Sequence, residues 1–211
     1  MCVSKKATTQ NIIDAIECGE KLFGENYIQN AIPKIDEIHR VENLNYLYPY
    51  NFSFIGHLQK NKVNKVLEHF SRIDSVDSVS LASTISSHYE KLSTSRAHIT
   101  TIEPFPILLE VKTSKDESKF GILPEVLPFL IESILEFKNV KIEGFMTLAT
   151  NTNDEKEICR CFSLLKSTQE KMETKFHTNF SVLSMGMSND YQHAIKEGST
   201  LLRIGSAIFG G

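Results

Sequence analysis

The last residues of the sequence are Ser184-Met-Gly-Met-Ser-Asn-Asp-Tyr-Gln-His-Ala-Ile-Lys-Glu-Gly-Ser-Thr-Leu-Leu-Arg-Ile-Gly-Ser-Ala-Ile-Phe-Gly-Gly211. This stretch predicts the end of a strand, a short helix, a second strand that carries Arg203, and a glycine turn. Ser188 or Asn189 can cap the helix, because their side-chain oxygens accept hydrogen bonds from free N–H groups of its first turn. Gly198 stands where that helix would end. The chain is therefore expected to finish with one αβ unit.

The turn after the last strand of this unit suits an anion. Arg203 would end the strand, and Gly205 and Ser206 follow almost directly. A glycine lets backbone N–H groups approach a phosphate, a serine hydroxyl adds a donor, and the start of a following helix adds a favourable dipole. The alternative is an ordinary αβ unit whose arginine faces solvent. The turn is thus a candidate phosphate site.

Strand and helix patterns alternate eight times along the whole chain. The expected strands cover residues 1–4, 22–24, 51–56, 72–76, 106–111, 140–146, 180–183 and 200–204. Alternation with short connections favours a parallel sheet with helices outside it, and eight units in about 200 residues are the size of a compact (β/α)8 TIM-type barrel. The alternative, an open doubly wound sheet, lacks its usual G-x-G-x-x-G signature here. We therefore predict one α/β barrel domain over residues 1–211.

Composition excludes several other classes of protein. Of the 211 residues 41% are hydrophobic and 23% are charged, and the net charge of −3 does not indicate a bulk nucleic-acid partner. No apolar run approaches the ~20 residues of a membrane span, and no secretory signal pattern is present. The four cysteines lack metal-ligand spacing, so we predict no metal site and interpret them as reduced thiols of a cytoplasmic protein: Cys2, Cys18, Cys159 and Cys161.

The barrel prediction places several polar residues together. In such barrels the site lies at the carboxyl ends of the strands, often with a phosphate after strands seven and eight. The residues expected there are Ser4, Lys5, Glu25 to Tyr27, His57, Asp77, residues 185–188, and Arg203 to Ser206. The candidate phosphate turn therefore coincides with the usual phosphate position of the barrel.

Lys5 is the candidate for covalent chemistry. Most lysines are solvated surface charges, but a lysine at a strand end opposite a phosphate pocket can lose its proton and form an imine with an aldehyde. Lys6 would point to the opposite face of a continuing strand. Pyridoxal phosphate is the common aldehyde that also needs a phosphate cradle. Arg203 would then contact either the phosphate or the pyridine nitrogen, which its permanent charge would keep unprotonated.

Short motifs in a fixed order carry a resemblance over nearly the whole chain. They are Val3-Ser-Lys5, Phe23-Gly-Glu-Asn-Tyr-Ile-Gln29, Phe54-Ile-Gly-His-Leu-Gln59, Asp74-Ser-Val-Asp-Ser78, Ser118-Lys-Phe-Gly121, Gly144-Phe-Met146, Leu183 to Asp190, and Gly198 to Gly210. With these motifs the sequence resembles the pyridoxal phosphate homeostasis proteins (the YggS/PROSC family), which are related to the N-terminal barrel of alanine racemase. The resemblance implies a fold-type III barrel that holds pyridoxal 5′-phosphate covalently on Lys5.

The resemblance also implies roles for other residues. It makes Arg203 the partner of the pyridine nitrogen. It assigns the phosphate contacts to Ser188, Gly205 and Ser206, and places Asn26 and His57 on the pocket wall. It implies a monomer or small homo-oligomer that maintains vitamin B6 homeostasis and supplies the cofactor to apo-enzymes. Two features depart from the family: its usual N-terminal helix is lacking before the first strand, and Lys6 and Ala7 stand where the family often has threonine and lysine.

Two functions from different classes compete. A racemase-like enzyme needs an acid–base group on each face of the imine, and in alanine racemase a tyrosine placed by a C-terminal β domain and a partner subunit supplies the second. This sequence ends at Gly211 with no such β domain, and Tyr27 is expected on the pocket wall. We therefore expect a non-catalytic carrier of pyridoxal phosphate. A racemase-like enzyme, or an interaction barrel with a vestigial site, is the alternative.

Overall fold

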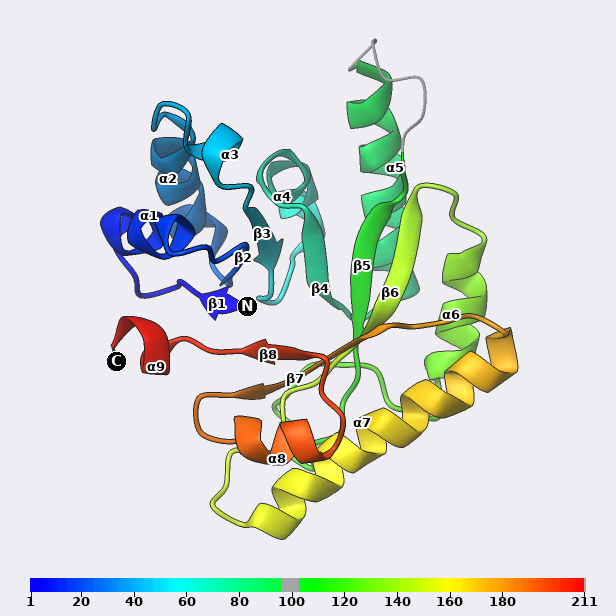
Figure 1. Ribbon diagram of the computed structural model, residues 1–211. Coiled ribbons are helices and arrows are strands. Elements are labelled where there is room, and N and C mark those ends of the chain that lie inside the picture. The colour runs from blue at the N-terminus through cyan, green and yellow to red at the C-terminus, as the bar shows by residue number, and fades with distance from the viewer. Residues whose placement is uncertain (96–102, 211) are drawn as a thin grey trace.

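The computed structural model describes residues 1–95 and 103–210, and its eight parallel strands form one sheet in the order of the chain (Figure 1). The strands are β1 (Cys2–Val3), β2 (Leu22–Glu25), β3 (Asn51–Phe54), β4 (Arg72–Val76), β5 (Phe105–Glu110), β6 (Val140–Met146), β7 (Val182–Met187) and β8 (Leu201–Arg203). Cys2 pairs with Ile204, and the N–H of Val3 donates to the carbonyl of Ile204 at 2.7 Å. This contact joins the last strand to the first, so the predicted (β/α)8 barrel is confirmed.

Helices surround this barrel on its outer side (Figure 1). They are α1 (Thr9–Glu17), α2 (Ile28–His39), α3 (Leu44–Leu47), the 3₁₀ helix η1 (Lys60–Lys62), α4 (Val63–His69), α5 (Val79–Ser95), α6 (Leu127–Leu135), α7 (Glu155–Phe176), α8 (Tyr191–Lys196) and α9 (Ser206–Phe209). Thr8 caps α1, because its hydroxyl accepts from the N–H of Asn11. Within residues 1–95 and 103–210, no helix is long and apolar enough to span a membrane.

Apolar side chains form the main hydrophobic core, whereas charged side chains lie inside the barrel. Side chains such as Phe54, Ile107 and Phe145 are fully buried in the main hydrophobic cluster. Arg72 of β4 approaches Glu143 of β6 to 3.6 Å, although β5 separates these strands in the sheet. Both side chains must therefore point into the barrel. A polar interior of this kind can support further charged groups near the carboxyl ends of the strands.

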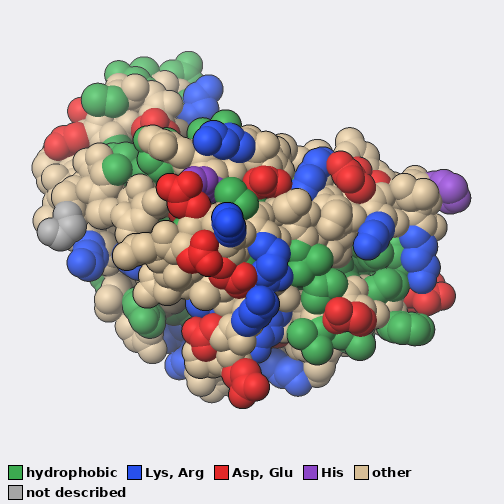
Figure 2. Space-filling model, turned by 90° about the horizontal axis from the view of Figure 1, so that it is seen from below, with side chains coloured by type: hydrophobic (Ala, Val, Ile, Leu, Met, Phe, Trp, Pro, Cys, Tyr) green, Lys and Arg blue, Asp and Glu red, His purple; other side chains and the backbone are tan. Residues whose placement is uncertain are grey.

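One outer face of the molecule is shown in Figure 2, where basic and acidic side chains are interspersed. Exposed apolar side chains on the outer layer include Phe129 and Leu135 of α6. Lys175 of α7 lies over the Phe129 ring, 6.0 Å from its centroid. The charge on this face is therefore mixed rather than gathered into one basic patch.

Two local predictions for the final stretch are wrong. The seventh strand covers Val182–Met187 instead of residues 180–183, because pairing with β8 extends as far as Met187. Neither Ser188 nor Asn189 caps α8, since Asp190 is the residue before its first turn. The Asp190 carboxylate instead accepts from the N–H of Met187 at 2.5 Å, which closes a turn between β7 and α8. The sequence also predicts a polar loop over residues 93–104, but α5 continues to Ser95, and residues 96–102 lie outside the described part of the chain.

Candidate functional site

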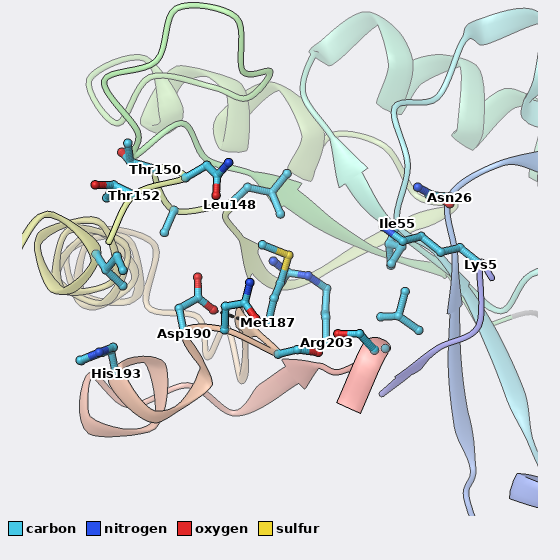
Figure 3. Close-up of a pocket in the computed structure, with 18 of the residues that line it drawn as sticks. Lys5, Asn26, Ile55, Leu148, Thr150, Thr152, Met187, Asp190, His193 and Arg203 are labelled. Carbon is cyan, nitrogen blue, oxygen red and sulfur yellow. Dashed lines mark hydrogen bonds between the residues drawn. The ribbon is translucent and has the colours of Figure 1, made fainter. Parts of the chain in front are cut away.

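A cavity of about 700 Å³ lies at the carboxyl ends of the strands (Figure 3). The predicted site residues that line it are Lys5, Asn26, Ser188, Arg203, Gly205 and Ser206. They follow or end β1, β2, β7 and β8, the ends at which parallel barrels carry their sites. The volume is in the usual range for small-molecule sites, roughly 300–1,000 Å³.

Arg203 is fixed on the floor of this cavity. Its side chain is buried, and its two terminal nitrogens donate to Ser184 Oγ and to the carbonyl of Thr147, each at 2.7 Å. Burial lowers the pKa of Arg203, whereas the negative charges of Asp74 and Glu110 oppose this shift. The guanidinium remains charged because arginine is not deprotonated in proteins. A fixed positive group is thus in place before any ligand binds.

Glu110 lies close to Arg203 in the barrel interior and is also buried. The pKa of Glu110 is raised to about 7, mainly by burial and also by the negative charge of Asp77, while the positive charge of Arg203 opposes the shift. A carboxyl group with this pKa is close to half protonated at neutral pH. The charge beneath the cavity therefore changes in the physiological pH range.

The turn after β8 brings donors to the cavity as predicted. Ser206 is exposed and begins α9, and Gly205 lies directly before it. A Cβ atom on Gly205 would lie 3.0 Å from the carbonyl oxygen of Val3, so a glycine allows the closing turn to approach β1. Ser188, from the turn after β7, lines the same cavity. These hydroxyl and backbone groups form a donor set suited to a phosphate.

Lys5 and Lys6 both line the cavity and are both exposed. The prediction that Lys6 points to the opposite face is wrong, because β1 ends at Val3 and the chain then turns. The N–H of Ala7 donates to the carbonyl of Ser4 at 2.9 Å and closes this turn. Figure 3 shows Lys5 on the side of the cavity where Asn26 and Ile55 also lie.

Asn26 contributes an unusual acceptor to the same wall. Its Oδ1 atom is buried and has no hydrogen-bond partner. The turn after β3 presses against this residue, since a Cβ atom on Gly56 would lie only 2.1 Å from the carbonyl oxygen of Asn26. A buried acceptor without a partner is costly unless a ligand or water supplies a donor.

His57 is placed differently from the other predicted residues. It is not among the residues that line the cavity. Its ring stacks on Phe120, with centroids 4.0 Å apart, and its Nδ1 lies 3.7 Å from a carboxylate oxygen of Asp77. A direct role for His57 in the pocket therefore stays a prediction.

The loop from β6 to α7 also lines the cavity, although none of its residues was predicted for the site. Its lining residues are Leu148, Ala149, Thr150, Asn151, Thr152 and Asn153. Glu157 holds the loop by accepting from Thr150 at 3.0 Å, and hydrogen bonds from Arg160 lower the pKa of Glu157 to about 2. The polar residues directly after β6 were the available signal, because the rule for strand ends applies to this strand as well.

Other lining residues come from elements that carried no prediction for the site. Lys119 donates to the carbonyl of Ala149, and thus joins the loop after β5 to the loop after β6. Asp190 and His193 line the opposite side of the cavity from Lys5 (Figure 3). Across the described ranges, no group of three or more His, Cys, Asp or Glu side chains is arranged to hold a metal ion.

Comparison with known proteins shows the family to which this chain belongs. The family model for the alanine racemase N-terminal domain matches residues 1–211. A pyridoxal phosphate homeostasis protein of Vibrio cholerae is 35% identical over 213 residues, which cover 100% of this chain and 84% of the relative. The structure of PipY from Synechococcus elongatus with pyridoxal phosphate bound has a TM-score of 0.85 at 29% identity, and the match covers 100% of this chain and 91% of PipY.

A more distant structure shows the fold alone. Alanine racemase of Clostridium difficile is 12% identical with a TM-score of 0.69, and the match covers 98% of this chain and 50% of the racemase. The chain belongs to the alanine racemase N-terminal domain family, and within it to the pyridoxal phosphate homeostasis proteins.

Proposed function

We propose that this protein binds pyridoxal 5′-phosphate and takes part in the homeostasis and supply of vitamin B6. The observation that carries this proposal is that one cavity joins the amine of Lys5 to the phosphate-type donors of Ser188, Gly205 and Ser206. An amine for the aldehyde and a cradle for the phosphate are the two features that this cofactor requires. The relatives named above support the same ligand.

The residues present fit the cofactor. The unpartnered Oδ1 of Asn26 can accept from a ligand donor. Gly205 and Ser206 of the turn after β8 line the cavity, where backbone N–H groups and a hydroxyl can contact an anion. Arg203, Lys5 and Lys6 add positive charge to the lining of the cavity. The positive charge and the donors of the turn after β8 suit an anionic ligand better than a neutral one.

Lys5 and Arg203 have separate roles in this proposal. Lys5 would hold the cofactor, because its amine can condense with the aldehyde with loss of one water molecule. Arg203 would be the partner of the pyridine nitrogen, and its hydrogen bonds to Ser184 and Thr147 already hold it on the cavity floor. When bound, the cofactor supplies an electron-withdrawing ring, and a permanently charged arginine keeps the ring nitrogen unprotonated and weakens that effect. The arrangement therefore suits holding of the cofactor.

A carrier is favoured over a racemase-like enzyme. Racemisation needs a second acid–base group on the face of the imine opposite the lysine. Tyr27, which was expected on the pocket wall, is 60% exposed and does not line the cavity, so it does not supply this group. The names of the relatives refer to homeostasis. We therefore propose that the protein supplies pyridoxal phosphate to apo-enzymes that depend on this cofactor.

An absorbance spectrum of the purified protein with pyridoxal phosphate tests the proposal. We expect an imine band that is lost in Lys5→Ala and kept in Lys6→Ala, a matched variant because both lysines line the cavity. Reduction with borohydride and peptide mapping should place the adduct on Lys5. Absence of the band, or an adduct spread over surface lysines, would contradict the proposal. Racemisation of amino acids by the wild type, lost in Lys5→Ala, would favour the enzyme instead.

A further inference from the structure

Ser4, the residue directly before Lys5, is held from several directions. It is fully buried, and its N–H donates to the carbonyl of Gly24 at 3.0 Å. Its hydroxyl donates to Glu25 Oε1 at 2.7 Å, and its carbonyl accepts from Lys34 Nζ at 2.8 Å. Contacts from β2 and α2 therefore meet at the residue that precedes the proposed imine lysine.

Glu25 and Lys34 form a buried ion pair behind this point. Lys34 Nζ lies 2.5 Å from Glu25 Oε1, and the two side chains are 15% and 1% exposed. The second oxygen of Glu25 is buried and has no hydrogen-bond partner. A buried ion pair often stabilises a fold no more than an apolar pair of similar size would. A contribution to the stability of the fold therefore does not explain why this ion pair is present.

The strand that leads to Lys5 is short and needs support from outside. β1 has two residues, and the chain turns immediately after Ser4. Lys5 itself is exposed, so packing does not hold its side chain. Reactive groups lose rate and affinity steeply when they are displaced, roughly 100-fold for about 1 Å. The contacts on Ser4 thus govern where the Lys5 amine can reach.

We propose that Lys34 and Glu25 are positioning residues that hold Ser4, and through it the Lys5 amine, at the reacting position. Neither residue lines the cavity, so they act through the backbone rather than by contact with the cofactor. This inference rests on the proposed function, because it requires that Lys5 form the imine. It predicts that loss of the pair weakens the covalent part of cofactor binding and spares the non-covalent part.

The test compares one change in two backgrounds. The double variant Lys34→Met/Glu25→Gln removes both buried charges and keeps the side-chain lengths, so that no unpaired charge is left inside. The double change is made in the wild type and in Lys5→Ala. In each background, titration measures the affinity for pyridoxal phosphate with and without the double change. We expect roughly tenfold weaker binding in the wild-type background and a change within about twofold in Lys5→Ala. The imine band should fall in parallel with the affinity.

Two further variants separate positioning from general loosening. Lys34→Arg keeps a donor and a positive charge, so we expect it to keep affinity within about threefold of the wild type. The matched control Lys65→Met/Glu68→Gln removes one charge of each sign from exposed positions on α4 and should leave binding unchanged. If the buried double variant does not fold, Ser4→Ala, which removes the hydroxyl bond to Glu25, takes its place in the same two backgrounds.

The outcomes separate this inference from the proposed function. Equal losses of affinity in the two backgrounds, or no loss in either, would overturn the positioning role while the imine band of the wild type upholds the proposed function. A wild type without an imine band would overturn the proposed function and the positioning role together. A loss confined to the background that contains Lys5 would support the positioning role.

Discussion

Arg203 donates a hydrogen bond of 2.7 Å to Ser184 Oγ, and both side chains are buried beneath the cavity. Its other terminal nitrogen donates to the carbonyl of Thr147 at the same distance. These bonds join Arg203, at the end of β8, to β7 and to the residue after β6, so the guanidinium is oriented without a ligand. A preorganised group of this kind does not have to be ordered when a ligand binds.

Ser184→Ala should therefore destabilise the fold. The substitution leaves a buried N–H of Arg203 without its acceptor, which costs about 1–3 kcal/mol. Urea unfolding of the variant measures this loss. Ser181→Ala is the matched control, because Ser181 is exposed on the same segment and should change stability by less than about 0.5 kcal/mol. Equal effects of the two substitutions would show that the bond to Arg203 contributes nothing.

Gly56→Ala should disturb both the fold and the site. The new Cβ atom would lie 2.1 Å from the carbonyl oxygen of Asn26, and backbone atoms at that distance must move apart. We expect a loss of at least about 2 kcal/mol in the free energy of unfolding. We also expect weaker binding of pyridoxal phosphate, because Asn26 lines the cavity.

Gly19→Ala is the control for Gly56→Ala. Gly19 has a φ of +98° and nothing within 4 Å of an added Cβ, so this change adds backbone strain without a clash. The expected cost is about 1–2 kcal/mol, with unchanged cofactor affinity. A Gly56→Ala variant that binds the cofactor as tightly as Gly19→Ala does would contradict the proposed contact between Asn26 and the cofactor.

The sequence allowed the fold to be predicted more securely than the ends of its elements. Alternation of strand and helix patterns reports on which faces are buried, and this pattern is local. The end of a parallel strand depends on its neighbour instead: Met187 belongs to β7 because it pairs with Arg203. The direction of Lys6 likewise depends on β1 stopping at Val3, which no local pattern in the turn indicates.

The candidate site likewise contains features that could be predicted from the sequence and features that could not. Lys5, Gly205 and Ser206 could be selected because their chemistry and their place after a strand are visible in the sequence. The contact of Lys34 with Ser4 could not be predicted, since it depends on how α2 packs against β1. Local patterns thus identify the groups that meet a ligand, whereas packing between distant segments decides what holds them.

Glu110 should make stability depend on pH. Its pKa rises from 4.5 in the unfolded chain to about 7 in the fold. The folded state therefore holds this proton more tightly, and the stability gained from it is fully present below about pH 4.5 and is lost as pH rises through about 7. The shift corresponds to up to about 3 kcal/mol. Urea unfolding of the cofactor-free protein at several pH values measures this loss.

Glu110→Gln provides the reference for that measurement, because it keeps the shape of the side chain and cannot titrate. The stability of the wild type should fall relative to this variant between about pH 5 and pH 8. The difference between the two curves isolates Glu110 from the other carboxylates. Parallel curves over this range would show that the carboxyl group of Glu110 titrates at its ordinary pKa.

The stack of His57 on Phe120 should behave as an energetic pair. Stacked rings of this kind contribute about 0.5–1.5 kcal/mol beyond the area they bury, so a double-mutant cycle of His57→Ala and Phe120→Ala should give a coupling of that size in urea unfolding. The matched cycle with Phe129→Ala should give none, because Phe129 is exposed on α6 and packs near Lys175.

His57 does not line the cavity, so the affinity of His57→Ala for pyridoxal phosphate should stay within about threefold of the wild type. A larger loss of affinity in His57→Ala than in Phe120→Ala would contradict this and support the pocket contact that the family resemblance implies.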